Sequence, residues 1–98
     1  MRLKIKKEVI PVKEVKMFMF ESCPHCKKAL EMKAALLEAH PEYKKVPFVM
    51  IDEKKEPETA DKYDYYYVPT FYVGEEKIAE GVPAEDNIAK VFALAYEG

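Results

Sequence analysis

Two cysteines, Cys23 and Cys26, are the residues in this 98-residue chain whose type and spacing most clearly indicate chemistry. They are its only cysteines, and two residues separate them. A bond between such close neighbours closes a very small loop and constrains the unfolded chain little, whereas secreted disulfide scaffolds carry more cysteines, spread along the chain. The spacing therefore favours a redox-active pair over a structural crosslink.

The sequence around the pair predicts that it lies where a strand ends and a helix begins. Residues 15–20 form a short apolar run typical of a buried strand, and Pro24 suits the first position of a helix. The unpaired N–H groups and the dipole at a helix N-terminus stabilise a thiolate. We therefore expect Cys23 to be the exposed nucleophile and Cys26, in the first turn of the helix, to be the less accessible resolving thiol.

Pro24 and His25, which lie between the two cysteines, are expected to tune the reactivity of the pair. Pro24 fixes its own φ angle, and His25 adds positive charge and a hydrogen-bond donor beside Cys23 when it is protonated. The histidine favours the thiolate and so the reduced form. The predicted reduction potential lies between about −120 mV and about −270 mV, the range between strongly oxidising and strongly reducing dithiol enzymes.

This arrangement predicts dithiol exchange with a disulfide substrate. The Cys23 thiolate attacks the substrate disulfide and forms a mixed disulfide. Cys26 then attacks Cys23, which releases the reduced substrate and leaves an intramolecular disulfide. The expected redox centre is the Cys23–Cys26 pair itself, with no separate cofactor and no bound metal.

Hydrophobic periodicity predicts an α/β domain with the order β-α-β-α-β-β-α. The expected strands are residues 15–20, 46–52, 70–73 and 77–80, and the expected helices are residues 24–40, residues 57–63 and a last helix that opens at Pro83. The first strand–helix–strand unit predicts a parallel pair and the last two strands a hairpin, so the central four-stranded sheet is mixed and flanked by helices. Residues 1–14 are expected to be an N-terminal extension and residues 15–98 the single domain.

The same patterns predict which side chains are buried. The predicted apolar stripe of the first helix is Leu30, Ala34 and Leu37, with Ala29, Met32 and Leu36 beside it. The predicted stripe of the last helix is Ile88, Val91, Phe92 and Ala95. Residues 46–52 are expected to form a strand that is buried on both faces, with Met50 in the core. Tyr63 and Tyr66 are expected to pack on the core, while Tyr65 and Tyr67 are equally consistent with packing and with docking of a substrate.

Composition and charge argue against several other classes of protein. Lys and Arg number 16 and Asp and Glu number 18, so the chain lacks the excess of positive charge that is typical of nucleic-acid binding. No apolar stretch approaches the ~18–20 residues of a membrane span or the ~7–15 residues of a signal-peptide core. We expect a cytoplasmic, monomeric protein that binds neither nucleic acid nor a membrane.

Three segments resemble glutaredoxins and other short thioredoxin-fold proteins: residues 15–20, the run Cys-Pro-His-Cys-Lys-Lys-Ala at 23–29, and residues 68–70, which read Val-Pro-Thr. The resemblance extends from about residue 15 to residue 96 and implies a thioredoxin-like fold with thiol–disulfide oxidoreductase activity. It implies that the Val68–Pro69 peptide bond is cis, that Pro69 packs beside the active-site pair, and that the Val68 backbone pairs with the substrate chain. Tyr67 stands in this substrate-binding segment, where glutaredoxins usually carry threonine.

The resemblance also bears on glutathione as a co-substrate. The positions that match glutathione or anion contacts are Lys27, Gly81, Glu85 and Asp86. Glu21 precedes the motif where glutaredoxins usually carry Lys or Arg, and its charge repels the glutathione carboxylates. The implied partners are protein or small-molecule disulfides, with either a reductase or glutathione as the electron donor.

Thioredoxins, by contrast, usually carry a buried Asp on the first strand, six residues before the first cysteine. This chain has Met17 at that position, so the resemblance supplies no proton acceptor for the resolving thiol. The sequence offers Glu21 or a water molecule as a substitute.

Two other functions remain open. In the first, Cys23 and Cys26 bind a metal centre. That centre is either zinc, for which His25 and His40 are the other candidate ligands, or an iron–sulfur cluster held across a dimer. In the second, the tyrosine-rich segment holds one specific protein, and the domain is a partner-specific redox sensor. Metal in the purified protein would indicate the first function, and a narrow range of substrates the second.

Overall fold

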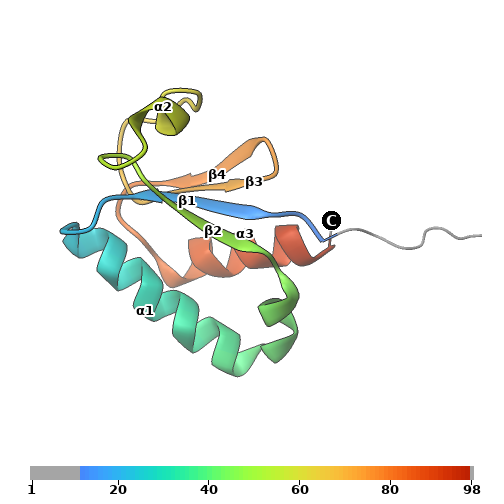
Figure 1. Cartoon of the computed structure of the whole chain (residues 1–98). Helices are drawn as coiled ribbons and strands as arrows, with labels where there is room; N and C mark the ends of the chain where they lie inside the picture. The colour runs from blue at the N-terminus through green and yellow to red at the C-terminus, as the bar shows by residue number, and fades with distance from the viewer. Residues whose placement is uncertain (1–11, 98) are drawn as a thin grey trace, which may run out of the picture.

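The computed structural model describes residues 12–97 as a four-stranded mixed sheet with helices on both of its faces (Figure 1). The elements are β1 (Val15–Met19), α1 (Pro24–Ala39), the 3₁₀ helix η2 (Pro41–Lys45), β2 (Phe48–Asp52), α2 (Pro57–Ala60), β3 (Thr70–Val73), β4 (Glu76–Glu80) and α3 (Glu85–Glu97). The predicted fold class and element order are confirmed, and η2 is an additional helical turn after α1.

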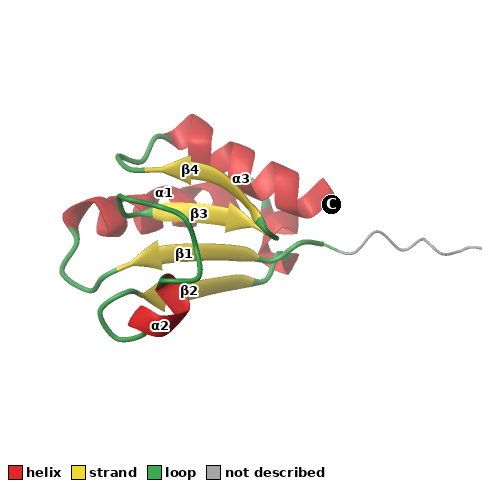
Figure 2. Cartoon of the chain, turned by 90° about the horizontal axis from the view of Figure 1, so that it is seen from above, coloured by secondary structure: helices red, strands yellow, loops and turns green. Residues whose placement is uncertain are grey.

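The sheet has the strand order β2-β1-β3-β4, which places β1 between β2 and β3 (Figure 2). β1 is parallel to β2 and antiparallel to β3, and β3 and β4 form an antiparallel hairpin. Because the chain passes from the end of β1 into α1 through a short turn, the N-terminus of α1 lies at the carboxyl end of a central strand. Both cysteines lie at this junction.

Alternation along β1 divides the core into two clusters, one on each face of the sheet. Val15 and Met17 pack in one cluster with residues of α1 and α3. These two helices lie on the same face of the sheet (Figure 1). The buried residues of α3 on that face are Ile88, Val91, Phe92 and Ala95, which is the predicted stripe. Phe18 packs with Ile51 and Tyr72 on the other face, under α2. Both faces of β1 are therefore buried, which explains its nearly continuous apolar sequence.

The prediction that the second strand is buried on both faces is wrong. β2 lies at the edge of the sheet, and the four-residue helix α2 covers little of it. Val49 and Met50 are accordingly 37% and 42% exposed, so Met50 is not a core residue. Ile51 is the buried residue of this strand, because it faces Phe18.

The buried side of α1 differs from the predicted stripe at Ala34. Cys26 and Ala29 are its buried residues, Leu30 and Leu37 are partly buried, and Ala34 is exposed. The buried line of the helix starts at Cys26 and continues through Ala29, Met32 and Leu36, beside Ala34. The second cysteine of the motif is therefore also a core residue.

The first described residues are already hydrogen-bonded to the domain. The Lys13 N–H donates to the Ala95 carbonyl at 2.9 Å, and the Gly74 N–H donates to the Glu14 carbonyl at 3.0 Å. Most of the predicted N-terminal extension, residues 1–11, lies outside the described residues. Within residues 12–97, no helix has the length and apolar character needed to cross a membrane.

Candidate active site

Cys23 is the N-cap residue of α1, and Pro24 is the first residue of that helix. The Cys23 Sγ accepts a hydrogen bond from the Cys26 N–H at 3.2 Å, and the Cys23 carbonyl accepts one from the Lys27 N–H at 3.1 Å. The sulfur thus occupies the position at which a Ser or Asp oxygen usually caps a helix. Negative charge on this sulfur is stabilised by the N–H group and by the helix dipole.

Both cysteines are free thiols, and both are buried. Cys23 is 4% exposed and Cys26 is 2% exposed, so the prediction that Cys23 is exposed is wrong. The capping hydrogen bond turns the Cys23 side chain back over the first turn of α1, and Val68 packs against the cluster that contains both sulfurs. The two cysteines are therefore almost equally buried, and they differ in their hydrogen bonds.

The surroundings of Cys26 disfavour its thiolate. Burial raises the pKa of the Cys26 thiol well above its usual range, and the hydrogen bond with Cys23 raises it further. The Phe20 backbone N–H acts in the opposite direction, while the charges of Cys23 and Glu53 raise the pKa again. One sulfur of the pair thus accepts an N–H bond at the helix start, and the other is a neutral buried thiol.

The segment before β3 contains Val68 and Pro69, and Val68 joins it to the core near the cysteines. The Val68–Pro69 peptide bond is cis, Pro69 is fully buried, and Val68 packs against the core cluster that contains Cys23. The Gly81 N–H donates to the Pro69 carbonyl at 2.9 Å. Within the described part of the chain, no hydrogen bond uses the N–H or carbonyl of Val68, so this short piece of backbone is free to pair with another chain.

Glu80, the last residue of β4, fixes the same segment and was not among the predicted site residues. Its carboxylate accepts the N–H of Tyr66, the N–H of Tyr67 at 2.9 Å and the ammonium group of Lys77 at 2.8 Å. The bond from Lys77 and then the two N–H groups lower the pKa of Glu80 to about 2. Residues 66 and 67 are far from Glu80 in sequence, and only the pairing of Thr70 with Glu80 in the hairpin brings them near it.

An open groove of ≈340 Å³ lies between this segment and the cysteine motif. Its lining residues are His25, Tyr67, Val68, Gly81 and Val82. Tyr67 and Val82 are 69% and 71% exposed, so much of the groove surface is apolar. The fold therefore gathers at one groove a motif residue and the segment that precedes β3, as the resemblance implied.

The candidate glutathione contacts do not converge on this groove. Gly81 lines it, whereas Glu85 and Asp86 line a different cavity of ≈280 Å³, which they share with Met32 and Leu36 of α1. Lys27 is exposed on α1 and lines neither cavity. Gly81, Glu85 and Asp86 are close in sequence, but Glu85 and Asp86 belong to the first turn of α3 and line a different cavity from Gly81.

No metal-binding cluster is found in the described part of the chain: no group of three or more His, Cys, Asp or Glu residues is arranged to hold an ion there. His40 is the C-cap residue of α1, at the opposite end of the helix from Cys23. Its Nδ1 lies 3.6 Å from the Glu42 carboxylate, in a surface pair.

The tyrosines before β3 divide into a packed pair and an exposed pair. The rings of Tyr63 and Tyr65 lie 4.8 and 4.9 Å from the Phe18 ring, between centroids. Tyr66 and Tyr67 are 83% and 69% exposed. The prediction that Tyr66 packs on the core is wrong, because residues 61–69 form no strand and the expected alternation does not apply.

A dithiol at a strand–helix junction, a cis-proline segment beside it and a mixed sheet between helices together define a thioredoxin-fold protein. The family model of the thioredoxin domain matches residues 13–93, and the chain belongs to this family. Membership supports thiol–disulfide oxidoreductase as the general class of activity. A comparison with curated proteins finds no match.

Solved structures with the same fold include two thioredoxins. The oxidised thioredoxin of Plasmodium falciparum has a TM-score of 0.65 and 18% sequence identity, over 86% of this chain and 81% of that one. The thioredoxin of Fasciola hepatica has a TM-score of 0.63 and 20% identity, over 87% of this chain and 83% of that one. A third structure, described as a malarial protein, has a TM-score of 0.60 and 15% identity, over 83% and 93%. At these identities the similarity shows the fold.

Proposed function

We propose that this protein is a dithiol–disulfide oxidoreductase in which Cys23 attacks a substrate disulfide and Cys26 resolves the mixed disulfide. The observation that carries the proposal is the position of Cys23. Its sulfur accepts an N–H bond from the first turn of α1, and Val68, which lines the groove, packs against the core cluster that contains Cys23. A thiolate at a helix N-terminus is the more stable and therefore the more available nucleophile of such a pair.

The exchange takes place in two steps. The Cys23 thiolate bonds to one substrate sulfur, the substrate S–S bond breaks, and the other substrate sulfur leaves as a thiolate. Cys26 loses its proton and attacks the Cys23 sulfur, and the second substrate sulfur leaves. Two electrons have then passed from the protein to the substrate, and the protein holds a Cys23–Cys26 disulfide. The reverse sequence oxidises a dithiol substrate.

A protein disulfide is the substrate that the groove favours. The free backbone of Val68 offers an N–H and a carbonyl to an extended chain, and Tyr67 and Val82 offer apolar contacts beside it. Glutathione is less favoured, because Glu85 and Asp86 line another cavity. A reductase protein is accordingly the preferred electron donor, in a reducing compartment such as the cytoplasm, and the protein works as a monomer.

Substrate trapping tests the proposed roles of the two cysteines. Cys26→Ser should form a stable mixed disulfide with reducible insulin, visible as a mass adduct, because the resolving thiol is missing. Cys23→Ser should form none, and both variants should lose turnover in insulin reduction by dithiothreitol. Equal adducts on both variants, or no adduct on Cys26→Ser, would contradict the assignment.

Redox titration and metal analysis separate the proposal from the metal-binding alternative. Equilibration of the pair in glutathione buffers, read by mass after alkylation, should give one two-electron transition between about −120 mV and about −270 mV. Protein purified without oxygen should contain no stoichiometric zinc or iron. A full equivalent of either metal, lost on oxidation of the pair, would favour the alternative.

A further inference from the structure

In the proposed function, Cys26 needs a proton acceptor, because a thiol must lose its proton before it attacks a disulfide. The Cys26 side chain is 2% exposed, and its burial disfavours the thiolate. In the mixed disulfide, the substrate occupies the side of the pair that faces the groove. The proton therefore has to leave Cys26 on another side of the strand–helix junction, where a base must receive it.

Glu53 lies at that junction, at the carboxyl ends of the two parallel strands. It directly follows β2, and its N–H donates at 2.8 Å to the carbonyl of Met19, the last residue of β1. The chain then runs from Met19 through the short turn that ends at Cys23. The negative charge of Glu53 is one of the influences that raise the pKa of the Cys26 thiol, which agrees with this placement.

The other carboxylates near the junction are engaged elsewhere. The Glu21 side chain is 82% exposed, and its carboxylate lies 3.6 Å from the Lys55 ammonium, so it points into solvent. The Asp52 carboxylate accepts the N–H of Lys54 at 2.9 Å and that of Lys55 at 3.3 Å, and so closes the turn after β2. The expectation that Glu21 serves as the proton acceptor is not supported by its position.

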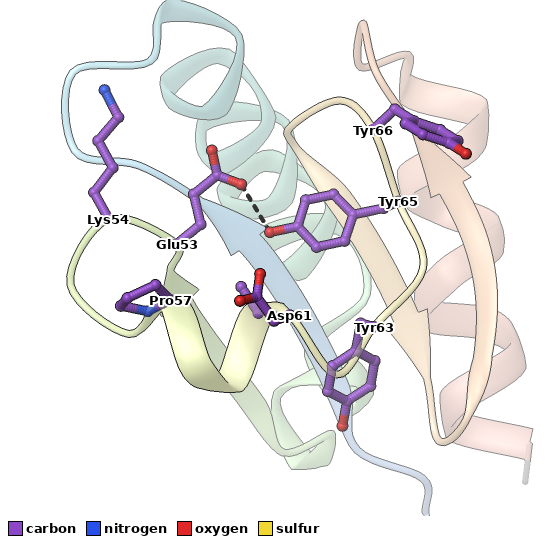
Figure 3. A pocket seen from close by; sticks show the side chains of 8 residues that line it. Glu53, Lys54, Pro57, Asp61, Tyr63, Tyr65 and Tyr66 are labelled. Carbon is purple, nitrogen blue, oxygen red and sulfur yellow. Dashed lines mark hydrogen bonds between the residues drawn. The ribbon is translucent and has the colours of Figure 1, made fainter.

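Tyr65 holds the Glu53 carboxylate in place, as Figure 3 shows. Its hydroxyl donates to Glu53 Oε1 at 2.7 Å, and its ring stacks on the fully buried Phe18. Burial and then the hydrogen bond to Glu53 raise the pKa of the Tyr65 hydroxyl above its usual range, so it remains a donor. Among the described residues no hydrogen bond uses the second oxygen of Glu53, which leaves that oxygen free to take a proton.

An open pocket on this side gives the proton a way out. The pocket has a volume of ≈340 Å³, and Glu53, Lys54, Asp61 and Tyr65 are among the residues that line it (Figure 3). It shares no lining residue with the groove beside Val68. A substrate docked in the groove therefore leaves this pocket open.

We propose that Glu53 accepts the proton of Cys26 during resolution of the mixed disulfide, that Tyr65 is its positioning residue, and that the proton leaves through the pocket under α2. This inference rests on the proposed function. The Cys26 S–H bond breaks, the proton moves to a Glu53 oxygen, and the Cys26 sulfur bonds to Cys23. The bond from Cys23 to the substrate sulfur breaks, and that sulfur leaves as a thiolate.

A chromogenic aromatic disulfide, dithiobis(nitrobenzoate), separates the two steps in one stopped-flow trace. Attack by Cys23 releases the first thionitrobenzoate, and resolution by Cys26 releases the second. In Glu53→Gln the first release should keep its rate within about twofold, and the second should slow at least about tenfold near neutral pH. The deficit should shrink toward high pH, where hydroxide removes the proton instead. Tyr65→Phe should slow the second release less than Glu53→Gln does and shift its pH profile.

Glu21→Gln is the matched control, because it removes a carboxylate from the same junction and should leave the second release unchanged. The other titratable and charged groups around Glu53, which stay constant in this comparison, are Cys23, Cys26, Lys54, Asp61, Tyr63 and Tyr65. Equal second releases in Glu53→Gln and Glu21→Gln at every pH would overturn the role of Glu53 and leave the proposed function intact. A single release from the wild type would instead overturn the proposed function.

Discussion

Cys23 has two tasks in this structure, and substitution can separate them. Its sulfur caps α1 by accepting the Cys26 N–H, and the same sulfur is the proposed nucleophile. A serine hydroxyl restores the cap without the thiolate chemistry, whereas an alanine methyl group restores neither. The cap turns the side chain back onto the first turn of α1, where it packs in the core cluster, and this accounts for the burial of the nucleophile.

Cys23→Ser should therefore be nearly as stable as the reduced wild type, and Cys23→Ala should be less stable by about 0.5–2 kcal/mol, the usual cost of losing an N-cap. Urea unfolding in reducing buffer, followed by circular dichroism, measures the free energies of unfolding. Both variants should be inactive in insulin reduction, so the serine variant separates loss of chemistry from loss of stability. Equal stabilities of the two variants would show that the sulfur hydrogen bond is not a cap.

At the scale of the elements, strand β4 holds the segment before β3 in place through its last residue, Glu80. Glu80 joins the hairpin to Tyr66 and Tyr67, and these residues precede the cis peptide bond at Val68. The groove thus depends on a carboxylate that faces neither the groove nor the cysteines. Protonation of Glu80 should release the segment that carries Val68.

The lowered pKa of Glu80 predicts how stability changes with pH. Its pKa is about 2 in the folded protein against an ordinary 4.5, so the unfolded chain binds the proton more readily. The contribution of Glu80 is fully present above pH 4.5 and is lost as the pH falls through about 2. The unfolding free energy of Glu80→Gln should thus lie roughly 1 kcal/mol below that of the wild type near neutral pH, since solvent screens the group, and should approach it in acid.

Urea unfolding at a series of pH values measures this difference. Glu76→Gln is the control, because Glu76 is an exposed carboxylate on the same strand. It should show no comparable pH dependence. A Glu80→Gln deficit that stays constant down to about pH 2 would contradict an ionic role for Glu80.

The elements also show how far the sequence could be interpreted. The stripe of α3 was predicted correctly, because a helical period needs only residues a few positions apart. The exposure of β2 could not be predicted, because it depends on the order of strands in the sheet and on the shortness of α2. The partners Tyr65 and Glu53 are 12 residues apart, and Tyr67 and Glu80 are 13 apart. No local pattern joins such pairs, and only the completed sheet brings them together.

At the scale of the whole molecule, the candidate active site and a cluster of packed aromatic rings lie at opposite ends of the sheet. The cysteines, Glu53 and the Val68 segment gather at the carboxyl end of β1. At the amino end, Phe92 of α3 stacks on Phe48, the first residue of β2, with a centroid distance of 5.9 Å. Tyr43 of η2 lies 6.1 Å from the same Phe92 ring. This aromatic group joins two helical elements to the sheet.

Phe92→Ala should therefore destabilise the fold and leave the thiol chemistry unchanged. Phe92 is 0% exposed, and removal of a buried Phe side chain typically costs about 3–5 kcal/mol. Leu94→Ala is the control on the same helix, because Leu94 is 39% exposed and should cost much less. Thermal unfolding measures the stabilities, and the stopped-flow assay below the unfolding transition measures both thiol steps. A large loss of rate in folded Phe92→Ala would show that the two ends of the sheet are coupled.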